Sequence, residues 1–199
     1  MKASEVRSYL DRISADTPVR PGLDALRQLQ RRHLLTVPFE NLSIHLGEEV
    51  RLDEGGLIDK VVHRGRGGFC YELNGAFAAL LRALGFEVTV LAARVFGGGR
   101  LGPVFDHATL RVDLEEPWLV DVGFGRFSQQ PLRLATGDEQ VDAAGRFQVL
   151  AAAEGDVDVL MDGELQYRVE ARSRTLEDFV PTTHRSGRHG SAAEARGRG

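Results

Sequence analysis

Apolar residues recur at helical spacing through the first third of the chain. Val6, Leu10 and Ile13 lie on one face of a predicted short helix, and Ser4 is its candidate N-cap. Further helices are predicted over 21–37, 54–63 and 69–84, and Gly85 stands where a left-handed C-terminal cap favours glycine. The pattern therefore predicts a helical bundle over residues 1–85.

After Gly85 the period of the pattern changes from helix to strand. Residues 86–95 are rich in β-branched side chains, and residues 107–114 alternate between apolar and polar. A turn at 115–117 leads into an apolar run at 118–122. Further strands are predicted over 146–152, 157–160 and 164–171. Several strands joined by short turns are typical of a small barrel or sandwich.

Residues 182–199 differ from the rest of the chain. They contain nothing more hydrophobic than alanine, and Arg, Gly, Ser and His dominate. Such a segment buries too little apolar surface to offset the entropy of ordering it, so we expect a disordered tail. A basic nucleic-acid arm is the weaker alternative, because the positive run is short and interrupted. The expected organisation is α+β, with helices over 1–85, strands over 86–181 and the tail over 182–199.

Composition excludes several classes of partner. The 25 Lys and Arg residues against 29 Asp and Glu give a net charge of −4, which leaves no basic footprint for nucleic acid or an anionic membrane. The longest apolar run, near 76–84, is too short to span a bilayer, and the N-terminus lacks the apolar core of a signal peptide. We expect a cytoplasmic protein. His33, His45 and His63 show no metal-ligand spacing, so we expect no metal.

The single cysteine, Cys70, follows a glycine-rich stretch at the predicted start of a helix. The unpaired amides and the partial positive charge at a helix N-terminus favour an anion, and therefore the thiolate. A thiolate nucleophile also needs a base, and the base needs an orienting acceptor. The alternative is that Cys70 is a small buried hydrophobe.

The predicted hairpin supplies both partners. If its turn is centred on Glu115, Thr109 faces Asp121 across the hairpin. His107 then lies diagonal to Asp121 on the same face, within side-chain reach, whereas a register shifted by one residue would send the two to opposite faces. A carboxylate inside the apolar run 118–122 also requires a partner. Taken singly, each residue also fits a structural role; together with Cys70 they form a candidate catalytic triad.

Four segments occur in a characteristic order: Val-Pro-Phe-Glu-Asn-Leu at 37–42, Arg-Gly-Arg-Gly-Gly-Phe-Cys-Tyr-Glu-Leu-Asn at 64–74, Asp-His at 106–107 and Val-Asp-Val-Gly-Phe-Gly at 120–125. They resemble the arylamine N-acetyltransferase family over roughly residues 4–181, and the block around the cysteine is the most specific. The resemblance implies a triad of Cys70, His107 and Asp121. It also implies an N-terminal helical bundle followed by an antiparallel β-barrel, with the triad at their junction.

In that family the cysteine takes an acetyl group from acetyl-coenzyme A and passes it to an arylamine, arylhydroxylamine or hydrazine. The resemblance implies the same substrates here, with a thioester on Cys70, His107 as the base and Asp121 holding its tautomer. The apolar residues expected around the acceptor ring are Phe39, Val95, Phe124 and Phe127. Of these, Phe127 fits a core position as well. The residues that bind coenzyme A are not assigned by the sequence.

Family members continue into a third, α/β lid segment, whereas this chain changes abruptly after Pro181 into the Arg/Gly/Ser/Ala-rich tail. A frameshift or truncation would produce such a change, so we expect the lid to be absent or incomplete and the activity to be impaired. Three alternatives stay open: an amide synthase for aromatic polyketide macrolactams, an inactive remnant or binding module, and a papain-like or transglutaminase-like thiol hydrolase. The segment at 37–42 favours the acetyltransferase over the hydrolase.

Overall fold

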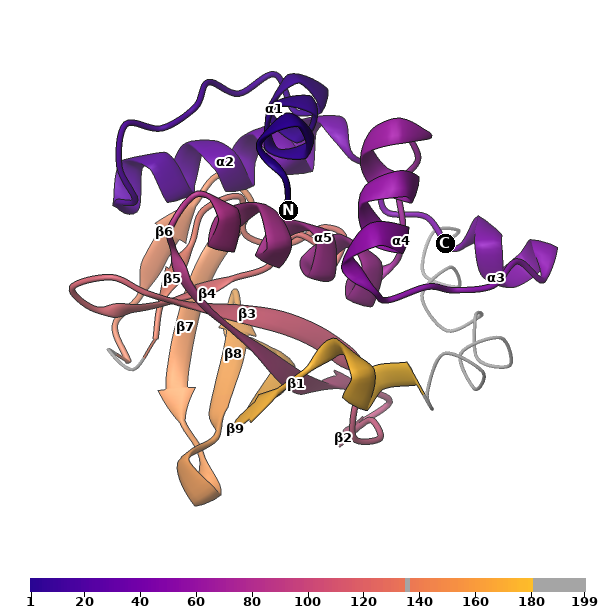
Figure 1. Cartoon of the computed structure of the whole chain (residues 1–199). Helices are drawn as coiled ribbons and strands as arrows, with labels where there is room; N and C mark the ends of the chain where they lie inside the picture. Colours follow the sequence, from indigo (N-terminus) through magenta and orange to yellow (C-terminus); the bar gives the residue numbers. More distant parts are fainter. Residues whose placement is uncertain (135–136, 181–199) are drawn as a thin grey trace.

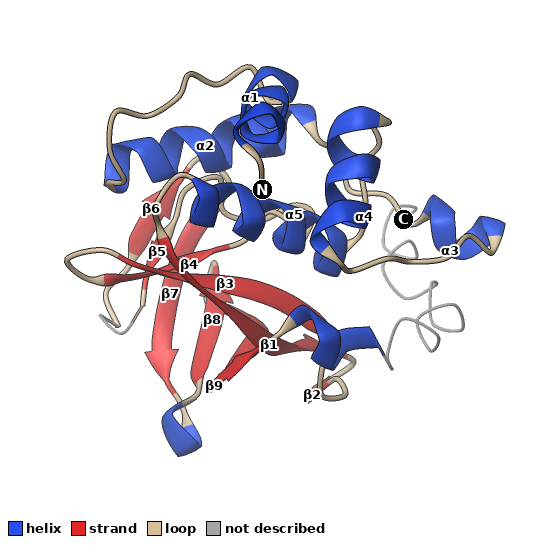
Figure 2. Ribbon diagram, in the orientation of Figure 1, coloured by secondary structure: helices blue, strands red, loops and turns tan. Residues whose placement is uncertain are grey.

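The computed structural model describes residues 1–134 and 137–180. The helices of its N-terminal part lie along one side of a strongly curled antiparallel sheet (Figure 1). Short helical segments that follow the first strands in the chain lie below the sheet and beside it (Figure 2). The α+β class predicted from the sequence is confirmed. The predicted disordered tail at 182–199 lies outside the described residues.

The helices of the N-terminal part follow one another closely. They are α1 Ala3–Arg12, α2 Leu23–Thr36, α3 Leu42–Leu46, α4 Glu54–Ile58, the π-helix η1 Asp59–His63 and α5 Cys70–Ala83. All four predicted stretches are helical, and α4 and η1 together fill the stretch predicted over 54–63. The short α3 was not predicted, because five residues are too few to show a helical period.

The ends of these helices bear out one predicted cap and correct another. Lys2, not Ser4, is the N-cap of α1, and its backbone N–H donates to the Glu5 carboxylate at 2.6 Å. Ser4 lies inside the helix. Gly85 adopts the predicted left-handed conformation, with φ of 88°, and lets the Phe86 N–H reach the carbonyl of Leu81 at 3.0 Å.

The strands form one antiparallel sheet in the order β5-β4-β3-β1-β9-β8-β7-β6, with β2 paired to the end of β1. Their bounds are β1 Glu87–Gly97, β2 Arg100–Leu101, β3 His107–Asp113, β4 Pro117–Val120, β5 Leu132–Arg133, β6 Gln140–Asp142, β7 Gly145–Ala151, β8 Val157–Met161 and β9 Glu164–Arg174. Because β5 also contacts β7, the sheet curls into a nearly closed barrel. The unpredicted strands β2, β5 and β6 are two or three residues long, too short to show alternation.

The register of the β3–β4 hairpin is the predicted one. Leu110 pairs with Val120 and Asp113 with Pro117. The next pair along the ladder brings Thr109 opposite Asp121, the residue that follows β4, so the hairpin is centred on Glu115 as expected. This register determines which face of the sheet receives the polar side chains.

Helix α5 packs against β1 and β3 and joins the helices to the barrel. Its buried Phe77 belongs to the same apolar core as Leu110 and Trp118 from the strands. A second core, which includes Phe147 and Tyr167, fills the barrel. Among the described residues no helix is both long and apolar enough to span a bilayer.

After β9 the chain returns to α5 through the 3-10 helix η3, Leu176–Phe179. The ring of Phe179 is fully buried, with ring centroids 4.9 Å from Tyr71 and 5.1 Å from Phe105. The segment that follows β9 is therefore anchored beside the first turn of α5.

Candidate active site

Cys70 is the first residue of α5 and is buried at the junction between the helices and the barrel. The loop after β4 lies directly against it: a Cβ at Gly123 would be 2.7 Å from the Cα of Cys70 and 3.0 Å from its carbonyl oxygen. No side chain fits in that space, so a glycine is required where the barrel backbone meets the start of α5.

His107 and Asp121 reach the thiol from the barrel. The Nε2 of His107, the first residue of β3, lies 2.6 Å from Oδ2 of Asp121, and both side chains are buried. The Cys70 side chain interacts with the same imidazole, and this interaction contributes to the raised pKa of His107. Because Nε2 is engaged by the carboxylate, the other ring nitrogen is the one available to the thiol. The structure thus brings the three residues singled out in the sequence into one chain of contacts.

The electrostatics of this group favour a charged imidazole. Burial by itself lowers the pKa of His107, but the charge of Asp121 and the hydrogen bonds from Asp121 and Cys70 outweigh it and raise that pKa to about 10. Burial by itself would raise the pKa of Asp121, yet His107, Asn74 and the Gly123 amide hold it below its usual value. The pair therefore rests as imidazolium and carboxylate at neutral pH.

Two further side chains hold Asp121, and sequence reasoning missed the role of both. Asn74 donates from Nδ2 to Oδ1 of Asp121 at 3.0 Å, and Tyr167 on β9 donates its hydroxyl to Oδ2 at 3.2 Å. Asn74 lies one helical turn after Cys70, a spacing that signals a shared face of α5. Nothing in the sequence points to Tyr167, because β9 reaches the site only when the barrel curls. Burial and the Asp121 charge raise the pKa of Tyr167, so its phenol stays a neutral donor.

Phe124 lies close to the His107 side chain, and Val95 lies on the strand next to that of His107. The ring of Phe124 meets the imidazole edge to face at a centroid distance of 5.1 Å. Val95 is half-buried on β1, two residues beyond Ala93, which pairs with His107. The Phe124 ring therefore places an apolar surface next to the imidazole.

Phe39 and Phe127 lie in different surroundings. The backbone of Phe39 forms a parallel bridge with Gly68 in the glycine-rich loop, and its side chain is 52% exposed. Phe127 is buried in the barrel core, 5.0 Å from Phe147 and 5.1 Å from Phe124 between ring centroids. Phe39 is thus open to a ligand, whereas Phe127 supports the barrel behind Phe124.

Within residues 1–134 and 137–180 no group of three or more His, Cys, Asp or Glu side chains is arranged to hold a metal ion. What the fold and the site define is a protein with a cysteine at a helix N-terminus, backed by a histidine and an aspartate from a barrel.

Known proteins are similar to this chain in sequence and in fold. A protein-family model described as N-acetyltransferase matches residues 22–192. The arylamine N-acetyltransferase of Escherichia coli (strain K12) is 37% identical over 180 residues, which make up 86% of this chain and 63% of that protein. The chain spans less than two thirds of the length of the curated relatives it matches.

Solved structures agree over most of the chain. The arylamine N-acetyltransferase of Salmonella typhimurium superposes with a TM-score of 0.85 and 32% identity, covering 94% of this chain and 70% of that one. The Mycobacterium marinum arylamine N-acetyltransferase in complex with CoA gives a TM-score of 0.83 and 34% identity, covering 94% and 72%. The chain belongs to the arylamine N-acetyltransferase family.

Proposed function

We propose that this protein transfers an acetyl group from acetyl-coenzyme A, through a thioester on Cys70, to the nitrogen of an arylamine, arylhydroxylamine or hydrazine. The observation that carries the proposal is the chain of contacts from the Cys70 thiol through the His107 imidazole to the Asp121 carboxylate, 2.6 Å from Nε2. The CoA complex of the Mycobacterium marinum relative supports the choice of donor.

The first half-reaction loads the cysteine. The Cys70 thiolate attacks the acetyl carbonyl, the new S–C bond forms, and the bond to the sulfur of coenzyme A breaks. The leaving thiolate takes the proton of the His107 imidazolium and departs as free coenzyme A. The amide of Cys70, in the first turn of α5, has no partner within the helix and can face the oxyanion formed on the way.

The second half-reaction removes the acetyl group from Cys70. The acceptor nitrogen attacks the thioester, neutral His107 accepts the proton lost from that nitrogen, and the Cys70 thiolate leaves. Asp121 keeps the imidazole in one tautomer and stabilises its positive charge. We place the acceptor ring against Phe124 and Val95, with Phe39 at the exposed side. Phe127 acts behind them as a core residue.

Intact-mass and peptide mass spectrometry after incubation with acetyl-coenzyme A tests the proposal. We expect one acetyl group on Cys70, released when an arylamine is added, and no adduct on the Cys70→Ser variant, which is close in size and should fold alike. An adduct without release would indicate a working triad with a defective acceptor or lid function. A folded protein with no adduct would favour the inactive remnant and contradict the proposal. The cytoplasmic location stays a prediction.

A further inference from the structure

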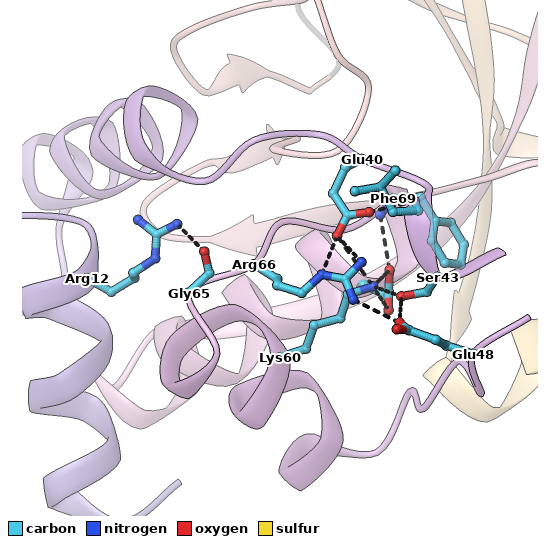
Figure 3. Close-up of polar contacts among 10 residues, drawn as sticks. Arg12, Glu40, Ser43, Glu48, Lys60, Gly65, Arg66 and Phe69 are labelled. Atoms are coloured by element: carbon cyan, nitrogen blue, oxygen red, sulfur yellow. Dashed lines mark hydrogen bonds and ion pairs between the residues drawn. The ribbon is translucent and has the colours of Figure 1, made fainter. Parts of the chain in front are cut away.

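Lys60 and Glu72 form an ion pair that is buried beside the first turn of α5. Their side chains are 9% and 2% exposed. The Nζ of Lys60 donates to both carboxylate oxygens of Glu72, at 2.7 and 2.8 Å, and to the hydroxyl of Ser43 at 2.9 Å. Figure 3 shows Lys60 reaching from its helix into this polar cluster. All three ammonium protons therefore have acceptors.

The Glu72 carboxylate also binds the backbone next to the nucleophile. Its Oε2 accepts the N–H of Phe69, the residue directly before Cys70, at 3.2 Å. The carboxylate folds under Gly68, where a Cβ would lie 2.8 Å from the same oxygen. Glu72 thus fixes the peptide from which α5 and the thiol begin.

The same cluster fixes the segment that carries Phe39. Arg66 donates from Nη2 to the Glu40 carboxylate at 2.9 Å, and the N–H of Glu40 donates to the carbonyl of Gly68 at 2.9 Å. The Nζ of Lys60 also lies 3.9 Å from Oε1 of Glu40. One group of charges therefore positions both the thiol and the exposed ring of Phe39.

A buried ion pair contributes little net stability compared with apolar residues of similar volume, so stability alone is a weak reason for this one. The position of the Lys60–Glu72 pair next to Cys70 suggests a second reason for its presence. Without Lys60, the negative charge of Glu72 would destabilise a thiolate on Cys70, two residues away. With Lys60 beside it, the Glu72 carboxylate holds the backbone while its charge is compensated.

We propose that Lys60 and Glu72 are positioning residues for the acyl-transfer site: Glu72 holds the backbone that presents Cys70, and Lys60 cancels its charge so that the thiolate persists. The inference rests on the proposed role of Cys70. Charged groups around the thiol and this pair include His107 and Asp121 on the barrel side and Glu40 and Arg66 on the helical side. The pocket that Lys60 and Glu72 line also receives charged side chains from Glu48, Glu49, Arg51, Asp59 and Arg64.

The test is the pH dependence of Cys70 alkylation by iodoacetamide, which reacts with the thiolate. Lys60→Met leaves the carboxylate uncompensated, and we expect the alkylation midpoint to rise by on the order of one pH unit. Glu72→Gln keeps an acceptor for Phe69 but removes the negative charge, and we expect the midpoint to fall. Arg111→Met, in the exposed pair of Arg111 with Asp113, is the control and should leave it unchanged.

A merely structural ion pair would lower the melting temperature of both variants without opposite shifts, and that result in folded protein would overturn the inference. If Lys60→Met does not fold, Glu72→Gln decides alone: a lower midpoint supports the inference, and an unchanged or higher one overturns it. Wild-type acetylation by acetyl-coenzyme A is measured in parallel. Opposite shifts without acetylation would leave the positioning role standing and remove the proposed function.

Discussion

Asp121 accepts hydrogen bonds from three separate parts of the fold: Asn74 on α5, His107 on β3 and Tyr167 on β9. A buried carboxylate is costly unless its oxygens are satisfied, and these donors meet that requirement while holding the carboxylate rigidly behind the imidazole. The residue is therefore both a stability requirement of the hairpin and the electrostatic support of the site.

Asp121→Asn tests that support. The amide keeps the shape but loses the charge that raises the pKa of His107, so the imidazolium is no longer stabilised. We expect acetyl transfer to fall by roughly 10³- to 10⁴-fold, as in other triads that lose this charge. Steady-state turnover with acetyl-coenzyme A and an arylamine measures it, with Asp113→Asn, on the same hairpin, as the control. Activity retained in Asp121→Asn would exclude a charge-based role.

Gly123→Ala tests the contact between the barrel loop and the nucleophile. The added Cβ would lie 2.7 Å from the Cα of Cys70, and backbone cannot give way as a flexible side chain does. We expect a loss of about 1–3 kcal/mol in the free energy of unfolding together with loss of acylation. Gly97→Ala, where nothing lies within 4 Å, is the matched control. Equal stability and acylation in both variants would refute the close-packing requirement.

At the scale of elements, His33 ties α2 to its neighbours. Its Nε2 lies 3.0 Å from the hydroxyl of Tyr9 on α1, and its ring packs 5.1 Å from that of Phe77 on α5. Burial, with a smaller effect from Arg12, lowers the pKa of His33 to about 3. The helices therefore pack around a neutral imidazole.

Acid should loosen this packing. Between pH 6.5 and 3 the unfolded chain binds a proton at His33 that the native protein does not, so the free energy of unfolding falls as the pH falls through that window. From pH 7 to 5 this amounts to about 2 kcal/mol. Urea unfolding at both pH values should show that His33→Gln loses this part of the acid sensitivity, whereas exposed His63→Gln keeps it. An equal pH dependence of the free energy of unfolding in wild type and His33→Gln would disprove this role of His33.

Elements with a clear period were predicted from the sequence, and short ones were not. Helix α5 and strand β3 each show several repeats of their apolar spacing, so their type and face followed from pattern alone. Helix α3 and strand β5 have too few residues to show a period, and tertiary contacts hold them in place. The cap of α1 was misassigned because Ser4 and Lys2 differ by local geometry that composition does not reveal.

At the scale of the molecule, the helices and the barrel share one apolar core. Leu110 on β3 is fully buried in it together with Phe77 of α5. Neither part keeps its apolar face covered without the other. We therefore expect helices and barrel to unfold together, although their residues fall in separate stretches of the chain.

Leu110→Ala tests this cooperativity. Removing the buried side chain should lower the free energy of unfolding by about 2–5 kcal/mol. The single tryptophan, Trp118, lies on β4 and reports on the barrel, while far-ultraviolet circular dichroism reports on the helices. Both signals should shift to the same lower denaturant concentration. Two separate transitions would show independent parts.

The sequence by itself determined the helix-to-strand order, the hairpin register and the three residues that meet at the thiol, because periodicity and alternation are local properties of the chain. It also carried the family resemblance, through the block around Cys70. Only the tertiary structure placed Tyr167 on Asp121 and Lys60 beneath Glu72. The first contact joins residues 46 positions apart and exists only once the barrel has curled, and the second joins residues 12 positions apart and exists only once the helix of Lys60 packs beside α5.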